Sequence, residues 1–174
     1  MNASTERFLI EGPAGPLEIA RDTPTSGHAG TLLIAHPHPL FQGTMDNKVV
    51  QTLARAALQK GWTAVRFNFR GVGKSGGTYG GGDGELDDWL AVKAQLAPTG
   101  ALAIAGFSFG AWIGMQLLMR RHEITGFVSV APPANLSDFS SLAPCPASGL
   151  VINGTADKVA PPKDTISLVN KLHE

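Results

Sequence analysis

The stretch ALAIAGFSFGAWIGM, residues 101–115, places a Gly-x-Ser-x-Gly motif between a strand and a helix. Residues 101–105 form a short apolar run that suits a strand buried in a sheet, and the mostly apolar residues 109–121 predict a well-covered helix. A serine on such a strand-to-helix turn is pushed clear of the sheet, while the two glycines keep side chains out of the crowded turn. We therefore predict that Ser108 is a nucleophile.

The motif also has a simpler interpretation. Ser108 could cap the helix that follows it, with Gly106 and Gly110 merely turning the chain. The order strand, motif, helix favours the nucleophile, because the free N–H groups and the positive dipole end of the helix then point at developing negative charge. The backbone N–H of Phe109 is the first candidate donor to such an oxyanion.

Strand-like and helix-like segments alternate on both sides of the motif. We expect strands at residues 7–11, 17–21, 31–35, 63–69, 101–105, 125–131 and 150–153, and helices at 50–58, 86–96, 109–121 and 161–172. The first two strands flank a Gly/Pro turn and predict an antiparallel pair. The remaining strand–helix–strand order predicts an α/β fold: a mostly parallel, twisted sheet with helices on both faces, in one domain over residues 1–174.

Composition and charge narrow the function classes. The chain has 174 residues, of which 43% are hydrophobic and 16% charged, and 14 basic residues balance 14 acidic ones. No broad basic field is therefore available to bind nucleic acid or anionic lipid. The lone Cys145 cannot form an internal disulfide or a multi-thiolate metal site. No signal peptide and no run of about 18 apolar residues is apparent, so we expect a cytoplasmic protein without a membrane partner.

The loop after the third expected strand reads HPHPLFQG, residues 36–43. A second oxyanion donor is expected here, and its two prolines have no N–H to offer. The candidates are the backbone N–H groups of His38 and Leu40, of which we favour His38. The histidine pair is a poor metal site, because no carboxylate or cysteine stands near it; we expect no metal or other cofactor, and predict that His36 anchors the loop.

The glycine-rich segment GVGKS, residues 71–75, invites a comparison with phosphate-binding loops. That pattern requires a glycine where this chain has Asn68, and it requires a helix where this chain continues with further glycines. We therefore exclude a nucleotide site. Arg70 is expected to pair with Glu85 or Asp87 and to shape the loop.

A catalytic acid is expected after the last strand. Asp157 fits, because a carboxylate at the end of a late strand can orient a histidine, and the order serine then acid is the one this chemistry uses. Asp138 is the weaker alternative. The one later histidine, His173, falls in the last expected helix, where it suits a helix end rather than a catalytic loop. If no further strand follows, the edge of strand 150–153 could pair with a second copy to form a homodimer.

Three segments together, residues 36–50, 66–75 and 106–111, resemble a small bacterial α/β-hydrolase family related to the dienelactone hydrolases. The resemblance covers nearly the whole chain and implies the α/β-hydrolase fold, with Ser108 as nucleophile and Asp157 as acid. In that family a histidine follows the last strand in a Gly-Ala-x-His-Phe-Phe-like segment. This sequence ends before such a segment, which predicts a C-terminally shortened domain that lacks the last strand and the loop of the catalytic histidine.

The predicted function is that of a serine hydrolase. The short connection between the last two expected strands leaves no room for a lid domain, so we expect an open pocket walled by Phe41, Trp112 and Phe139. Such a pocket suits small carboxylic esters, cleaved through an acyl-enzyme on Ser108. The alternative is a catalytically impaired binding or interaction protein with the hydrolase fold, because the triad histidine is absent.

Overall fold

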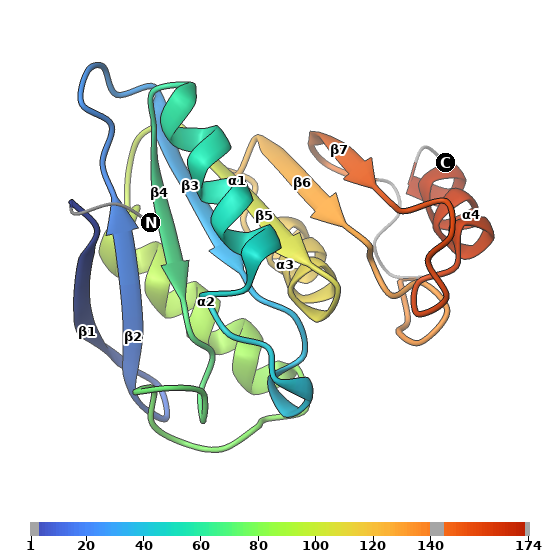
Figure 1. Cartoon of the computed structure of the whole chain (residues 1–174), viewed down its shortest axis with the longest axis horizontal. Coiled ribbons are helices and arrows are strands. Elements are labelled where there is room, and N and C mark those ends of the chain that lie inside the picture. Colours follow the sequence, from blue (N-terminus) through green and yellow to red (C-terminus); the bar gives the residue numbers. More distant parts are fainter. Residues whose placement is uncertain (1–3, 140–144, 173–174) are drawn as a thin grey trace.

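The computed structural model describes residues 4–139 and 145–172 (Figure 1). Its elements are β1 (Glu6–Gly12), β2 (Gly15–Asp22), β3 (Gly30–Ala35), the 3₁₀ helix η1 (Pro39–Phe41), α1 (Lys48–Gln59), β4 (Trp62–Phe67), α2 (Asp83–Leu96), β5 (Leu102–Phe107), α3 (Phe109–Arg120), β6 (Gly126–Val130), β7 (Ser148–Ile152) and α4 (Pro162–Leu172). Every strand and α-helix expected from the sequence is present, with ends that differ by a few residues. The short η1 was not expected.

The strands form one sheet in the order β1-β2-β4-β3-β5-β6-β7. β1 and β2 pair antiparallel, β2 pairs antiparallel with β4, and all other neighbours are parallel. This confirms the predicted antiparallel start and the mostly parallel sheet. Crossover helices between the strands make the parallel pairing possible, because a strand can reach a parallel neighbour only through a long connection.

The register of the parallel strands brings their carboxyl ends to one edge of the sheet. Ala35, the last residue of β3, pairs with Phe67 of β4 and with Gly106 of β5. Val130, the last residue of β6, pairs in the same way with Ile152 of β7. The loops that follow these strands therefore emerge side by side, and open α/β sheets bind their ligands at this edge.

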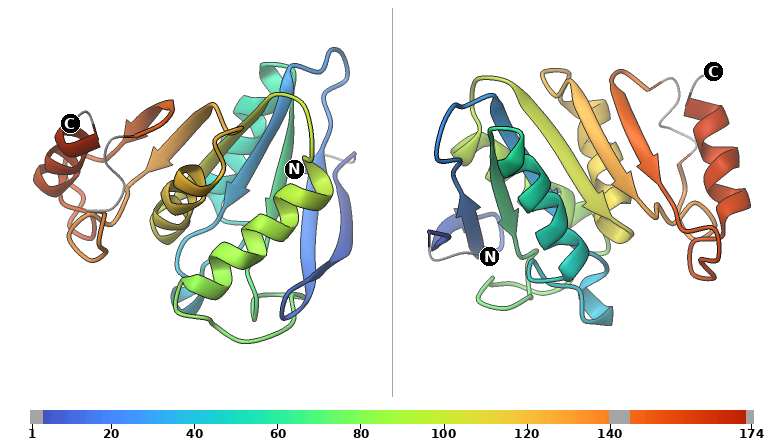
Figure 2. Two further views of the ribbon diagram at one scale, coloured as in Figure 1. Left: turned by 180° about the vertical axis from the view of Figure 1, so that it is seen from behind. Right: turned by 45° about the horizontal axis from the view of Figure 1, so that its top comes forward.

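Helices cover both faces of the sheet, as the sequence predicted. Helix α1 lies on one face, while α2 and α3 lie on the other, as the front and back views show (Figures 1 and 2). The larger hydrophobic cluster is on the α2 and α3 side, where Trp89 is fully buried, and the smaller one includes Val50 and Ala54 of α1. Leu168 and Leu172 of α4 join the larger cluster.

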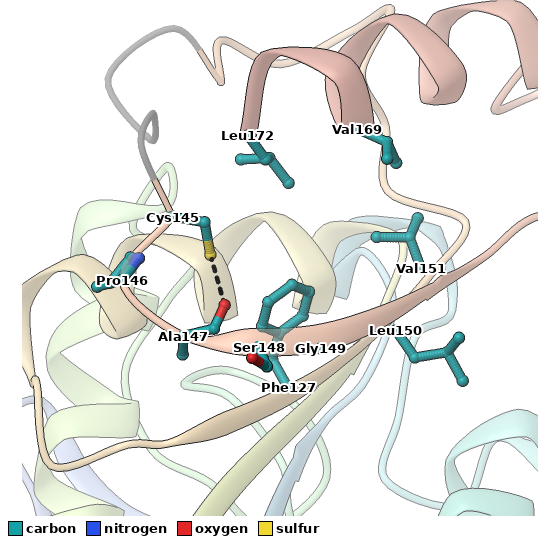
Figure 3. A pocket seen from close by; sticks show the side chains of 10 residues that line it. All are labelled: Phe127, Cys145, Pro146, Ala147, Ser148, Gly149, Leu150, Val151, Val169 and Leu172. Atoms are coloured by element: carbon teal, nitrogen blue, oxygen red, sulfur yellow. Dashed lines mark hydrogen bonds between the residues drawn. The ribbon is translucent and has the colours of Figure 1, made fainter. Parts of the chain in front are cut away.

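The β7 side of the sheet is the less covered one. Among the described residues β7 pairs with β6 alone, and the side chains of Leu150 and Ile152 are exposed. Between β7 and α4 lies a hollow of about 550 Å³, where Val151 approaches Val169 and Leu172 (Figure 3). This hollow does not include Ser108. In the part of the chain that the structure describes, no helix is both long and apolar enough to cross a membrane.

Candidate active site

Ser108 occupies a strained turn between β5 and α3. Its backbone has φ +54° and ψ −113°, a positive-φ conformation that non-glycine residues rarely adopt. Its N–H donates to the carbonyl of Val130 at 2.9 Å, which ties the turn to the end of β6. The Ser108 side chain makes no capping hydrogen bond to the helix that it precedes. The capping interpretation is therefore wrong, and the geometry is that of a half-buried serine on a sharp turn.

The two glycines of the motif are required by close approach rather than by backbone flexibility. A Cβ atom on Gly106 would lie 2.4 Å from the backbone of Gly110, and a Cβ on Gly110 would lie 2.5 Å from the carbonyl oxygen of Ala35. Real Cβ atoms do not approach backbone atoms so closely. The two glycines thus allow α3 to begin directly after Ser108 and to pack against the end of β3.

Ser108 lines a cavity of about 460 Å³ at the carboxyl edge of the sheet. The cavity walls come from five loops or helix ends and consist of His38, Phe41, Tyr79, Gly81, Ser108, Phe109, Trp112, Pro133, Leu136, Ser137 and Val159. Phe41 and Trp112 were expected there from the sequence. Tyr79, Leu136 and Val159 were missed; Tyr79, the single tyrosine of the chain, stands out in its glycine-rich loop and could have been noticed.

Phe139, the third predicted wall residue, does not line this cavity. Its side chain is 8% exposed and belongs to the larger hydrophobic cluster, where it borders α4 instead. The indole N–H of Trp112 donates to the carbonyl of Asp138, the residue before Phe139, at 3.2 Å. The prediction failed because burying an aromatic ring in the core is more favourable than leaving it on an open wall.

His36 anchors the loop after β3, as predicted. Its ring is fully buried; Nε2 accepts from the N–H of Phe69 at 3.1 Å, and Nδ1 therefore carries the proton and donates to the carbonyl of Pro37 at 2.6 Å. Burial lowers the pKa of His36 to about 4, so the ring stays neutral. Because the Pro37 carbonyl and the His38 N–H belong to one planar peptide unit, this bond also fixes the direction of that N–H.

The two candidate oxyanion donors of the loop differ in availability. The N–H of Leu40 donates to Nδ1 of the His38 ring at 3.2 Å and is therefore already used. The N–H groups of His38 and Phe109 donate to no other backbone group within the described residues. Both of these residues line the cavity beside Ser108, and their rings pack with centroids 4.8 Å apart.

Asp157 lies in the loop between β7 and α4, two residues before the cavity residue Val159. Its Oδ1 accepts from the N–H groups of Val159 and Ala160, both at 2.8 Å. Asn153 braces the same loop, because its Nδ2 donates to the carbonyl of Ala160 at 2.9 Å and its Oδ1 accepts from the hydroxyl of Thr165 at 2.9 Å. Asp157 does not itself line the cavity. Asp138, the alternative acid, borders the pocket beside Phe139 instead.

The glycine loop is held differently from the prediction. Arg70 pairs with Asp88, not with Glu85 or Asp87, through a contact of 2.8 Å between Nη2 and Oδ1. The hydrogen bonds to buried Asp88 and its charge raise the pKa of Arg70. Glu85 is also fully buried, but it accepts from the N–H groups of Gly80 and Gly82 at 2.9 and 2.8 Å. Proximity in sequence could not identify the residue of α2 that faces Arg70.

The described residues contain one histidine in the cavity wall, His38, and both of its ring nitrogens are hydrogen-bonded. His173, which the sequence placed at a helix end, lies outside the described residues. Over residues 4–139 and 145–172, no group of three or more His, Cys, Asp or Glu side chains could hold a metal ion.

Solved structures of known proteins resemble the whole described fold. A protein from Agrobacterium tumefaciens, described as a candidate alpha/beta hydrolase, is 50% identical, with a TM-score of 0.88 over 96% of this chain and 78% of that one. A lid-free α/β serine hydrolase from Xanthomonas campestris is 40% identical, with a TM-score of 0.88 over 98% and 80%. An alpha-beta serine hydrolase homologue from Coxiella burnetii is 40% identical, with a TM-score of 0.91 over 100% and 84%.

The fold and these likenesses define the class: the chain has the α/β-hydrolase fold and is a hydrolase of the α/β-hydrolase superfamily. Residues 16–143 match the model of a family described as X-Pro dipeptidyl-peptidase (S15 family). The chain belongs to this family.

Proposed function

We propose that the chain is a carboxylesterase-type serine hydrolase that cleaves small, uncharged carboxylic esters through an acyl-enzyme on Ser108. The observation that carries the proposal is the strained turn at Ser108. Ser108 lines the 460 Å³ cavity, and its hydroxyl makes no capping hydrogen bond to α3. Backbone strain of this kind is retained where the surrounding structure enforces it, commonly at active sites.

The reaction would proceed in two steps. Oγ of Ser108 attacks the ester carbonyl carbon, and the N–H groups of Phe109 and His38 bind the oxygen that becomes negative. The C–O bond to the alcohol then breaks, the alcohol leaves with a proton, and the acyl group stays on Ser108. A water molecule attacks this second ester, which releases the carboxylic acid and restores the serine. Asp157 is the proposed acid of the site, and within the described residues no histidine of the cavity wall is free to act as the base.

The cavity favours uncharged esters. None of its described wall residues is Asp, Glu, Lys or Arg. A charged group of a substrate would lose its hydration there without an opposite charge to replace it. A dipeptidyl-peptidase substrate carries an N-terminal ammonium group, so the same argument favours an esterase over the activity in the family's description. The relation to dienelactone hydrolases, the cytoplasmic location and the homodimer stay predictions from the sequence.

The second candidate function is a hydrolase-shaped binding protein without turnover. One observation favours it: among the described histidines, the single one in the cavity wall, His38, has both ring nitrogens engaged. In that case the pocket would still bind small esters, but Ser108 would not be acylated at a useful rate, since loss of the base costs orders of magnitude in rate.

Labelling with a fluorophosphonate separates the two functions. We expect Ser108 to be labelled in the natural sequence and the label to vanish in Ser108→Ala, as read by mass spectrometry of the labelled peptide. The matched control is Ser26→Ala, which removes an exposed serine from the loop between β2 and β3 and should leave the label unchanged. Ester binding without any labelling of Ser108 would favour the binding protein and contradict the esterase.

A further inference from the structure

The His38 ring has a defined protonation state. Its Nδ1 accepts the N–H of Leu40 at 3.2 Å, so Nδ1 cannot carry a proton. A neutral imidazole has one N–H, which must then be on Nε2. Nε2 lies 3.2 Å from the hydroxyl oxygen of Tyr79, so Nε2 donates and the tyrosine oxygen accepts. Burial lowers the pKa of His38, which agrees with a neutral ring.

This arrangement determines what Tyr79 can do. Because its oxygen accepts from His38, its own hydroxyl proton must point away from the imidazole. Tyr79 lines the same cavity as Ser108, and its ring lies 5.1 Å from that of His38 and 6.1 Å from that of Phe109, measured between centroids. Within residues 4–139 and 145–172, this hydroxyl donates a hydrogen bond to no other group. A hydrogen-bond donor is thus available in the pocket wall.

The local charge selects the kind of acceptor. The buried Glu85 carboxylate is held beside the glycine loop by Gly80 and Gly82. Burial raises the pKa of Tyr79, and the negative charge of Glu85 raises it further. An anionic acceptor would be repelled by this charge and would meet no Lys or Arg among the described wall residues. An uncharged oxygen, such as an ether or a hydroxyl, is the acceptor that fits.

We propose that Tyr79 is a specificity-determining residue whose hydroxyl, oriented by the His38 ring, donates a hydrogen bond to an uncharged oxygen of the substrate outside its scissile ester. The proposal rests on the ester substrate proposed above and narrows it to small oxygenated esters. The competing explanation is that the Tyr79 hydroxyl only fastens the glycine loop to His38. In that case its loss would affect all esters equally.

The test uses Tyr79→Phe, which keeps the ring and removes the hydroxyl, with two pairs of esters in which an oxygen replaces a methylene. The acyl pair is 4-nitrophenyl methoxyacetate and 4-nitrophenyl butanoate, and the alcohol pair is 2-methoxyethyl acetate and butyl acetate. In one pair, the preference of kcat/KM for the oxygenated ester should fall about five- to tenfold in Tyr79→Phe, as expected for one hydrogen bond. The intrinsic reactivity of each ester cancels when the two proteins are compared.

Thr78→Val is the matched control, because it removes a neighbouring hydroxyl that is exposed and outside the cavity wall. This variant should keep the preference of the natural sequence in both pairs. The pair that responds to Tyr79→Phe shows whether the oxygen belongs to the acyl or the alcohol part. An equal change for both members of each pair, or no change at all, would overturn the proposal.

Binding to Ser108→Ala separates failure of this proposal from failure of the esterase function. We expect Tyr79→Phe, added to Ser108→Ala, to weaken binding of the oxygenated ester about five- to tenfold relative to its methylene partner, by calorimetry. If the natural sequence shows no acylation but this difference persists, the esterase is wrong and the role of Tyr79 stands. If acylation occurs and the difference is absent from rates and binding, the role of Tyr79 is wrong. A protein that neither binds nor cleaves any of these esters contradicts both.

Discussion

Ser108 and Asp157 both follow parallel strands, yet the structure holds the two strands in different ways. β5, before Ser108, lies between β3 and β6 and is largely buried, whereas β7, before Asp157, is mostly exposed and pairs with β6 alone among the described residues. The nucleophile is therefore fixed by packing from all sides. The candidate acid is held by hydrogen bonds within its own loop, which are individually weaker constraints than a close-packed core.

The largest difference is expected between two glycines. In Gly106→Ala the new Cβ would lie 2.4 Å from backbone atoms of Gly110, so a helix end must shift; in Gly154→Ala the nearest atom, Cβ of Asp157, is 3.7 Å away. We expect Gly106→Ala to lower the free energy of unfolding by about 3 kcal/mol and Gly154→Ala to change it by less than about 0.5 kcal/mol, in urea titrations. Equal effects of the two substitutions would remove the contrast between the regions.

Acid should lower the stability of the central region first. Burial lowers the pKa of His36 from 6.5 to about 4, so between these pH values the unfolded chain binds a proton that the folded chain does not. The contribution of the neutral His36 ring to stability is complete above pH 6.5 and is lost as the pH falls toward 4. We expect a loss of about 2 kcal/mol at pH 5 relative to neutral pH, measured by denaturant titration across this range.

The control for this prediction is His36→Gln, which we expect to be less stable at neutral pH and which has no imidazole to titrate. The decrease in stability between pH 7 and pH 5 should therefore be about 2 kcal/mol smaller in His36→Gln than in the natural sequence. The described part of the β7 side, residues 145–172, contains no histidine. A pH dependence that survives His36→Gln would show that the acid-sensitive group lies elsewhere.

The smallest effect is expected in the loop of Asp157. Asn153→Ala removes the side-chain bonds to Ala160 and Thr165, and we expect a cost of about 1 kcal/mol. Hydrogen exchange of residues 153–160 should become faster while that of β5 stays the same, because the loop does not share the packing of the central strands. The control is Asn170→Ala on the exposed face of α4. Faster exchange in β5 as well would mean that the two regions are coupled.

Local patterns explain what could be predicted. The strand, the Gly-x-Ser-x-Gly motif and the helix are consecutive in the chain, so the turn at Ser108 and the need for Gly106 and Gly110 follow from neighbouring residues. The His36 anchor was predictable in part: its bond to Pro37 lies within a short proline-rich loop, whereas its bond to Phe69 joins a segment that is distant in the chain. The expected strands and helices were present for the same reason: their periodicity is a property of short segments.

Contacts between distant segments explain what could not be predicted. Tyr79 reaches His38 across 41 positions in the chain, and no periodicity links the two. Arg70 selects Asp88 over nearer carboxylates because of how α2 is rotated against the glycine loop. Phe139 enters the core instead of the cavity for a similar reason, since the fold of the chain after β6 decides which way its ring points.

The sequence by itself therefore determined the order of the elements, the parallel sheet and the position of the candidate nucleophile, because each depends on residues close together in the chain. The tertiary structure decided the walls of the cavity, the tautomer of His38 and the donor on Tyr79, because these depend on loops that meet only at the carboxyl edge of the sheet. Packing sets which side chains of those loops are buried and which remain available to a substrate.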